Sequence, residues 1–183
     1  MIRRKGIGIV IAGLVMGFAA LPLAAFAAAN TAGLKSFSAQ GVGTGALAAG
    51  DCSLPAITCA GTCECLTGAE TILANQGFNK GSLTFELSIE MGGTTLPIST
   101  AGFCLPATGF GTIASSNGKS TVLIDVSGLA CPTTEGAAEV FNGTYHVTGG
   151  TGGKKTFTTG TGAINGSLEG TVSRVSLSGN VQP

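Results

Sequence analysis

The chain has little of what many binding sites are built from. It has no tryptophan, one tyrosine and one histidine, and 10% of its residues are charged. An outer-membrane barrel needs interfacial bands of aromatic side chains, which this composition does not supply. The basic residues after the N-terminal stretch are scattered, whereas binding to a nucleic-acid backbone depends on clustered cations. The composition therefore argues against both an outer-membrane barrel and a nucleic-acid partner.

Catalytic groups are scarce as well. A nucleophile triad would have to use His146, which we place on the polar face of a strand. Glu86 and Glu90 share a strand face, but four residues of strand hold them about 13 Å apart, beyond the roughly 5 to 9.5 Å of a glycosidase pair. The sequence shows no catalytic residue, no metal site and no cofactor site, and it favours a protein that is not an enzyme.

The N-terminus has the pattern of a secretory signal. Arg3, Arg4 and Lys5 precede an uncharged run from Gly6 to Phe26, and Ala25-Phe26-Ala27 gives the small-residue pattern of a cleavage site. We predict a signal helix in residues 1–27 that is removed, with no stable membrane insertion afterwards, so the protein is secreted or periplasmic. An uncleaved anchor is the alternative, because the run approaches the roughly 20 residues that span a bilayer.

The predicted mature chain has the size of one domain. It holds 156 residues, with six basic and nine acidic side chains and a formal charge of −3. The full chain has 31 glycines, far above the usual share of about 7%. Disorder is nevertheless not expected, since Val, Ile, Leu and Phe recur along the chain.

Alternation of hydrophobic and polar residues marks the strands. It runs through residues 78–91, 121–127, 138–148 and 163–173, with Phe85, Leu87, Tyr145 and Val147 on hydrophobic faces. A period of two is typical of half-buried strands. Val172 is the last residue on the hydrophobic face of the final run. Hydrophobic residues then move from even to odd positions, which predicts a turn or bulge near Ser173-Arg174.

The connections are read from turn residues. Asn117-Gly118 predicts a two-residue type I′ hairpin turn, and the Gly-rich residues 149–153 predict a loop. Gly68 to Gln76 could form at most two helical turns.

Together these features predict an all-β fold, an antiparallel barrel or sandwich, and a barrel would also leave no exposed strand edges. Residues 78–183 are expected to form the barrel core. Residues 28–77 are expected to add N-terminal strands and a Cys-rich irregular segment that pack on it, within the same domain.

Six cysteines in an exported chain indicate disulfides. A turn centred on Asn117-Gly118 pairs residues whose numbers add up to 235, and Cys104 and Cys131 satisfy this condition. We therefore predict a Cys104–Cys131 disulfide. The other four, Cys52, Cys59, Cys63 and Cys65, are expected to pair among themselves, with Cys63 and Cys65 too close to bond to each other. A metal site on Cys59, Cys63 and Cys65 is the alternative, but the CxxC pairs of structural zinc modules are absent.

One stretch resembles a known family. Residues Phe141 to Ser167, FNGTYHVTGGTGGKKTFTTGTGAINGS, are similar to the dirigent and allene oxide cyclase barrel superfamily, with Gly143, Tyr145, Val147 and the turn Gly149 to Gly152 matching its pattern. The aromatic and Ala-x-Gly stretch that usually follows is replaced by Lys154-Lys155-Thr156-Phe157. The resemblance implies an eight-stranded barrel with an apolar lumen, in which relatives steer the cyclisation or coupling of a hydrophobic intermediate. Their catalytic side chains are not identifiable in this chain.

Three functions are compatible with these observations. The first is an exported binding or structural barrel, with a small apolar molecule as a possible partner at the barrel mouth and with Phe85, Leu87, Tyr145 and Val147 as lining residues. The second is a cyclase-like or isomerase-like enzyme. The third is a cell-surface or matrix component that contacts other proteins through Gly/Thr-rich faces. The volume of the lumen distinguishes them, because ligand binding needs a cavity of several hundred Å³.

Overall fold

A computed structural model describes residues 33–53, 62–75, 80–92, 102–133, 138–151 and 157–182. All of them belong to one compact unit, Ala32–Pro183. The predicted signal segment 1–27 lies outside the described residues. Within the described part of the chain, no helix has the length and apolar character needed to cross a bilayer.

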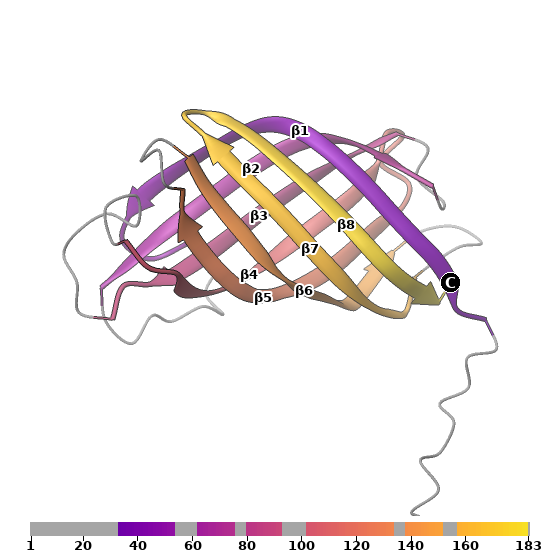
Figure 1. Cartoon of the computed structure of the whole chain (residues 1–183). Helices are drawn as coiled ribbons and strands as arrows, with labels where there is room; N and C mark the ends of the chain where they lie inside the picture. The colour runs from indigo at the N-terminus through magenta and orange to yellow at the C-terminus, as the bar shows by residue number, and fades with distance from the viewer. Residues whose placement is uncertain are drawn as a thin grey trace, which may run out of the picture. The chain divides into compact units, whose positions relative to one another are not determined.

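Eight antiparallel strands form a closed barrel, in which each strand pairs with its neighbours in the chain and β1 pairs with β8 (Figure 1). The strands are β1 Lys35–Ala49, β2 Cys63–Ala74, β3 Gly81–Glu90, β4 Leu105–Ser115, β5 Thr121–Pro132, β6 Ala138–Thr151, β7 Thr159–Glu169 and β8 Val172–Gln182. The predicted all-β antiparallel barrel of eight strands is confirmed. Closure leaves no strand edge unpaired, which removes a route to aggregation.

The barrel wall begins earlier than the alternation predicted. Strands β1 and β2 are part of it, so the wall starts at Lys35 and not near residue 78. Residues Gly68 to Ala74 are strand rather than helix. Alternation does not reveal these strands, because several of their lumen-facing positions hold no hydrophobic side chain. These positions are Gly41, Gly43 and Gly45 in β1, and Glu64, Gly68 and Glu70 in β2.

The turn between β4 and β5 differs from the prediction in type but not in register. Only Gly118 has a positive φ, at 66°, and Asn117 does not, so the turn is not type I′. Ser115 and Ser120 close a four-residue loop through the hydrogen bond from Ser115 N to Ser120 O, at 2.9 Å. The loop is centred on the same point, and β4 and β5 therefore pair with residue numbers that add up to 235, as in Leu105 with Ala130.

Two other connections lie away from their predicted places. The β7–β8 turn is at Gly170-Thr171, where Gly170 has a φ of 60°, and not near Ser173-Arg174. Val172 is consequently on the outer face and 40% exposed, while Ser173 faces inward. Strand β6 continues through Gly149 and Gly150 to Thr151, with a bulge in its pairing opposite Leu123 and Ile124.

Side chains of all eight strands fill the lumen. At several places a large side chain packs over the glycine with which it pairs on the neighbouring strand. A Cβ on Gly68 would lie 2.2 Å from the Phe85 ring, and one on Gly162 would lie 2.7 Å from the Tyr145 ring. Near one opening, Phe37 packs edge-on against Tyr145 and Phe157, with centroid distances of 6.5 and 6.2 Å. Glycine in the wall thus makes room for aromatic packing inside it.

The strands wind steeply around the barrel. Following paired residues from Ser36 through all eight strands leads back to β1 at Ala46, ten residues further along. A shear of this size over eight strands corresponds to a strand tilt of about 40°. We call the opening where β1, β3, β5 and β7 begin the lysine end, after Lys35, Lys80 and Lys119, and the opposite opening the carboxylate end. In Figure 1 the lysine end is on the side of the C-terminal label.

Candidate functional site

Three glutamates project into the barrel, where most of the other inward-facing residues are hydrophobic or glycine. Glu64 and Glu70 occupy even-numbered positions of β2, which face the lumen together with Leu66 and Ile72. Glu139 is inward-facing on β6. The three are 8%, 3% and 8% exposed. Burying carboxyl groups in an apolar lumen is costly unless they are protonated or paired, so these positions are the candidate functional site.

Glu70 is held by a hydrogen bond across a glycine. Gly43 of β1 pairs with both Glu70 and Ser173, and because it has no side chain the Ser173 hydroxyl can donate to Glu70 Oε1. The second oxygen, Oε2, has no hydrogen-bond partner. Burial raises the pKa of the Glu70 carboxyl, and the bond from Ser173 lowers it in part.

Glu139 and Glu64 lie at the carboxylate end, where β6 and β2 begin. Burial raises the pKa of Glu139 to about 7, and the negative charge of Glu64 adds to the increase. Glu139 Oε2 is buried and has no hydrogen-bond partner. The Glu139 carboxyl is therefore partly protonated near neutral pH and able to exchange a proton there.

Among the described residues, a small cavity lies in the lumen beside these groups. Its volume is about 30 Å³, and Glu139, Ser173 and mostly hydrophobic side chains line it. Such a volume corresponds to about one water molecule. Phe85 and Leu87, two of the predicted lining residues, border the cavity, whereas Tyr145 and Val147 face inward without bordering it. The structure thus brings together two of the four.

The aromatic cluster explains where Tyr145 lies. Its ring is 1% exposed and packs against Phe37 towards the lysine end. Its hydroxyl is buried without a hydrogen-bond partner, and burial raises the pKa of Tyr145 to about 12. Tyr145 therefore contributes packing and stays protonated.

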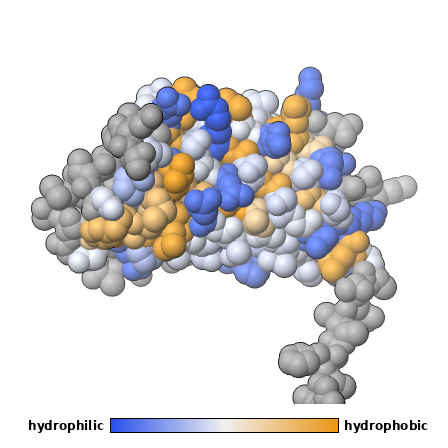
Figure 2. Space-filling view, viewed as in Figure 1, coloured by the Kyte–Doolittle hydropathy of each residue, from blue (hydrophilic) through white to orange (hydrophobic). Residues whose placement is uncertain are grey.

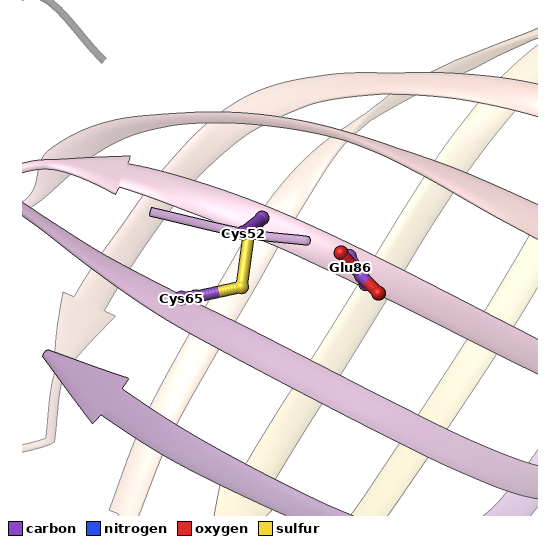
Figure 3. A group of neighbouring side chains, drawn as sticks. All are labelled: Cys52, Cys65 and Glu86. Atoms are coloured by element: carbon purple, nitrogen blue, oxygen red, sulfur yellow. A yellow bond between two sulfur atoms is a disulfide. The ribbon is translucent and has the colours of Figure 1, made fainter. Parts of the chain in front are cut away.

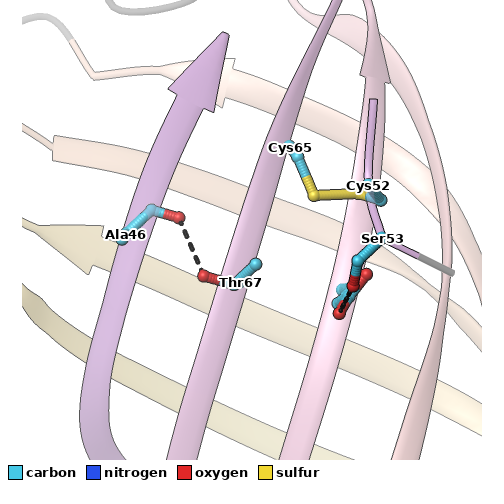
Figure 4. The surroundings of a disulfide bond; sticks show 6 residues. Ala46, Cys52, Ser53, Cys65 and Thr67 are labelled. Carbon is cyan, nitrogen blue, oxygen red and sulfur yellow. Dashed lines mark hydrogen bonds between the residues drawn. A yellow bond between two sulfur atoms is a disulfide. The ribbon is translucent and has the colours of Figure 1, made fainter. Parts of the chain in front are cut away.

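Disulfides fix the chain around the carboxylate end. Cys104 is bonded to Cys131, the pair that the register predicts, and Cys52 is bonded to Cys65. Cys63 is also disulfide-bonded, while Cys59 lies outside the described residues. The Cys52–Cys65 bond ties Cys52 to β2, and the Ser53 hydroxyl donates a hydrogen bond to Glu86 of β3, so these residues lie on the outside of the barrel wall (Figure 4).

Cys52, Cys65 and Glu86 form the one group of possible metal ligands among the described residues (Figure 3). The two sulfurs are bonded to each other, so neither is a thiolate that could bind a metal. Glu86 instead accepts a hydrogen bond of 2.7 Å from the Ser53 hydroxyl. The group is a structural attachment of the Cys-rich segment to the wall.

Comparison with known proteins adds no relative. No protein-family model matches the chain, and no curated protein or solved structure matches it either.

The sequence contained a signal for one of the three buried glutamates. Glu139 has the same parity as Phe141 and Tyr145 in the strand predicted over 138–148, so its inward position could have been inferred. Glu64 and Glu70 could not, because β2 carries cysteines on its outer face and glutamates and glycine on its inner face. Although Leu66 and Ile72 also face inward, neither face of β2 has an unbroken run of hydrophobic residues at alternate positions.

Proposed function

We propose that this protein is an exported, disulfide-stabilised barrel that works through its outer surface as a structural or binding module. The observation that carries the proposal is the packing of the lumen by the described side chains: the cavity beside Glu139 and Ser173 has a volume of about 30 Å³, far below the several hundred Å³ that a small-molecule site occupies. Export is supported by the predicted signal segment and by disulfides, which persist in oxidising compartments.

The outer wall offers more room than the lumen. Two open hollows on it have volumes of about 680 and 850 Å³. The larger one spans β1, β2, β7 and β8 and includes Val42 and Leu73, which are 57% and 60% exposed. On the face shown in Figure 2, hydrophobic side chains are interspersed among hydrophilic ones. Such a mixed surface is typical of contacts that form and separate in water.

Short side chains cover another part of the wall. Ser127, Thr144, Ala163 and Ser178 are cross-strand neighbours on β5 to β8, and all four are exposed. A surface without long side chains lets a partner approach the wall closely and loses little side-chain entropy on binding. This supports a role in contacting other macromolecules.

Native mass spectrometry of the mature protein purified from its host tests the proposal. We expect each polypeptide to have the mass of the oxidised chain, with no small molecule retained. As a matched control, Phe85→Ala enlarges the lumen cavity, and apolar cavities of about 150 Å³ can take up benzene or xenon. The control shows that an occupied lumen would be detected. A small molecule retained by the wild-type protein at one per chain would contradict the proposal.

The same measurement addresses the cyclase-like alternative suggested by the resemblance of Phe141 to Ser167. Steering a hydrophobic intermediate requires space for it within the barrel, and a cavity the size of one water molecule provides none. Glu139 would be the acid–base group of such a reaction. A stoichiometric hydrophobic ligand in the lumen would favour this alternative over the structural one.

A further inference from the structure

We propose that the barrels associate end to end, with the lysine end of one copy docking on the carboxylate end of the next. This inference rests on the proposed function, since it names a second copy of the chain as a partner of the outer surface.

The charged side chains are segregated along the barrel axis. Lys35 is the first residue of β1, Lys80 directly precedes β3, and Lys119 lies in the turn before β5. All three are exposed, and Lys80 O accepts a hydrogen bond of 3.1 Å from Ser116 N, which places Lys80 beside the turn that carries Lys119. Among the described residues, no acidic side chain lies at this end.

The opposite opening has the opposite sign. Asp51 follows β1, Glu90 ends β3 and Glu169 ends β7, and these three carboxylates are exposed. Glu64 and Glu139 lie just inside the same opening. Arg174 is the one described basic residue near it, and it pairs with Glu169 at 3.8 Å. Within the described part of the chain, Arg174 thus leaves the exposed carboxylates Asp51, Glu90 and Glu169 only partly neutralised.

The two rims are too far apart to neutralise each other within one barrel. Ten residues of strand at about 3.3 Å each, inclined by about 40°, separate them by about 25 Å along the axis. The screening length at physiological ionic strength is about 8 Å, so attraction across one barrel is negligible. When two copies stack, the same charges come within a few Å.

A second copy is the partner that these observations favour. One chain presents both complementary surfaces, and like-charged ends disfavour a head-to-head arrangement. A head-to-tail contact uses different surfaces on the two copies, so it repeats and generates open filaments or rings instead of a closed dimer. Exposed ion pairs are individually weak, so association should depend strongly on concentration and salt.

Charge exchange between the two ends tests the inference. Sedimentation velocity of the mature wild-type protein should show a weight-average mass that rises with concentration at about 0.01 M salt and returns to the monomer at about 1 M. The triple variants K35E/K80E/K119E and D51K/E90K/E169K should each remain monomeric at low salt. An equimolar mixture of the two should associate again, because one variant then has two acidic ends and the other two basic ends.

The control is Asp125→Asn, which removes a charge from the middle of the wall and should leave the association unchanged. Circular dichroism establishes that each variant is folded. A wild-type protein that stays monomeric at low salt overturns the inference, as does association that persists in K35E/K80E/K119E or a mixture that stays monomeric. The lumen is not involved in these outcomes, so they are independent of the mass-spectrometric test of the proposed function.

Discussion

At the scale of single residues, the buried glutamates couple the stability of the barrel to pH. The pKa of Glu139 rises from an ordinary 4.5 to about 7 in the folded protein, chiefly because of burial. The folded state therefore holds this proton more tightly than the unfolded state does. The stabilisation is complete below about pH 4.5 and is lost as the pH rises through about 7.

Glu139→Gln should remove this dependence. Glutamine has the shape of the protonated side chain and no charge, so the variant should be more stable than the wild type above pH 7 by up to about 3 kcal/mol. Below pH 4.5 the two should be nearly equal. Urea denaturation followed by circular dichroism across this range measures the difference.

Glu169→Gln is the matched control, because that side chain is 70% exposed at the same end of the barrel. Its pH profile should follow that of the wild type. If Glu139→Gln destabilises the protein above pH 7, the carboxylate is instead stabilised there by contacts that outweigh its burial.

At the scale of strands and turns, the disulfide at the base of the β4–β5 hairpin stabilises the fold. It does so by restricting the conformations of the unfolded chain. Cys104 and Cys131 are 27 residues apart, and Cys52 and Cys65 are 13 apart. Loop-closure entropy gives about 3.6 kcal/mol for the first bond and about 2.9 kcal/mol for the second. C104A/C131A should therefore be destabilised somewhat more than C52A/C65A, as measured by guanidinium denaturation under oxidising conditions. Equal denaturation midpoints for C104A/C131A and the wild type would rule out this contribution.

The same hairpin shows which parts of the fold could be predicted from sequence. The register was correct although the turn type was wrong, because register depends on where the loop is centred and not on its φ angles. Strands β3, β5 and β6 were recognisable since their inward positions are mostly hydrophobic. Strand β1 was not, because its inward residues Gly41, Gly43 and Gly45 give no hydrophobic signal. A Cβ on any of them would approach atoms of the neighbouring strands too closely. In a filled barrel, small inward residues are as necessary as large ones, and a hydrophobic pattern detects only the latter.

At the scale of the whole molecule, closure between β1 and β8 defines the architecture. Lys35 pairs with Val181, and a Cβ on Gly33 would lie 3.7 Å from the Gln182 side chain, so the two ends of the barrel sequence are adjacent. This pairing joins residues far apart in the chain, and its closure entropy opposes folding, although that entropy grows only slowly with loop length. Changing the order in which the strands follow one another in the chain should therefore change the free energy of unfolding little, provided that every strand pairing is kept.

A circular permutant tests this directly. A short linker joins Gln182 to Gly33, and new termini are opened between Asn117 and Gly118 in the exposed turn. The β1–β8 pair then becomes local and the β4–β5 pair becomes distant, so the two changes in closure entropy largely cancel. We expect the same far-ultraviolet circular dichroism and an unfolding free energy within about 1 to 2 kcal/mol of the wild type. A permutant opened between Val126 and Ser127, in the middle of β5, breaks strand pairing and should not fold. If the first permutant also fails to fold, the order of the strands, and not their pairing alone, determines whether this barrel closes.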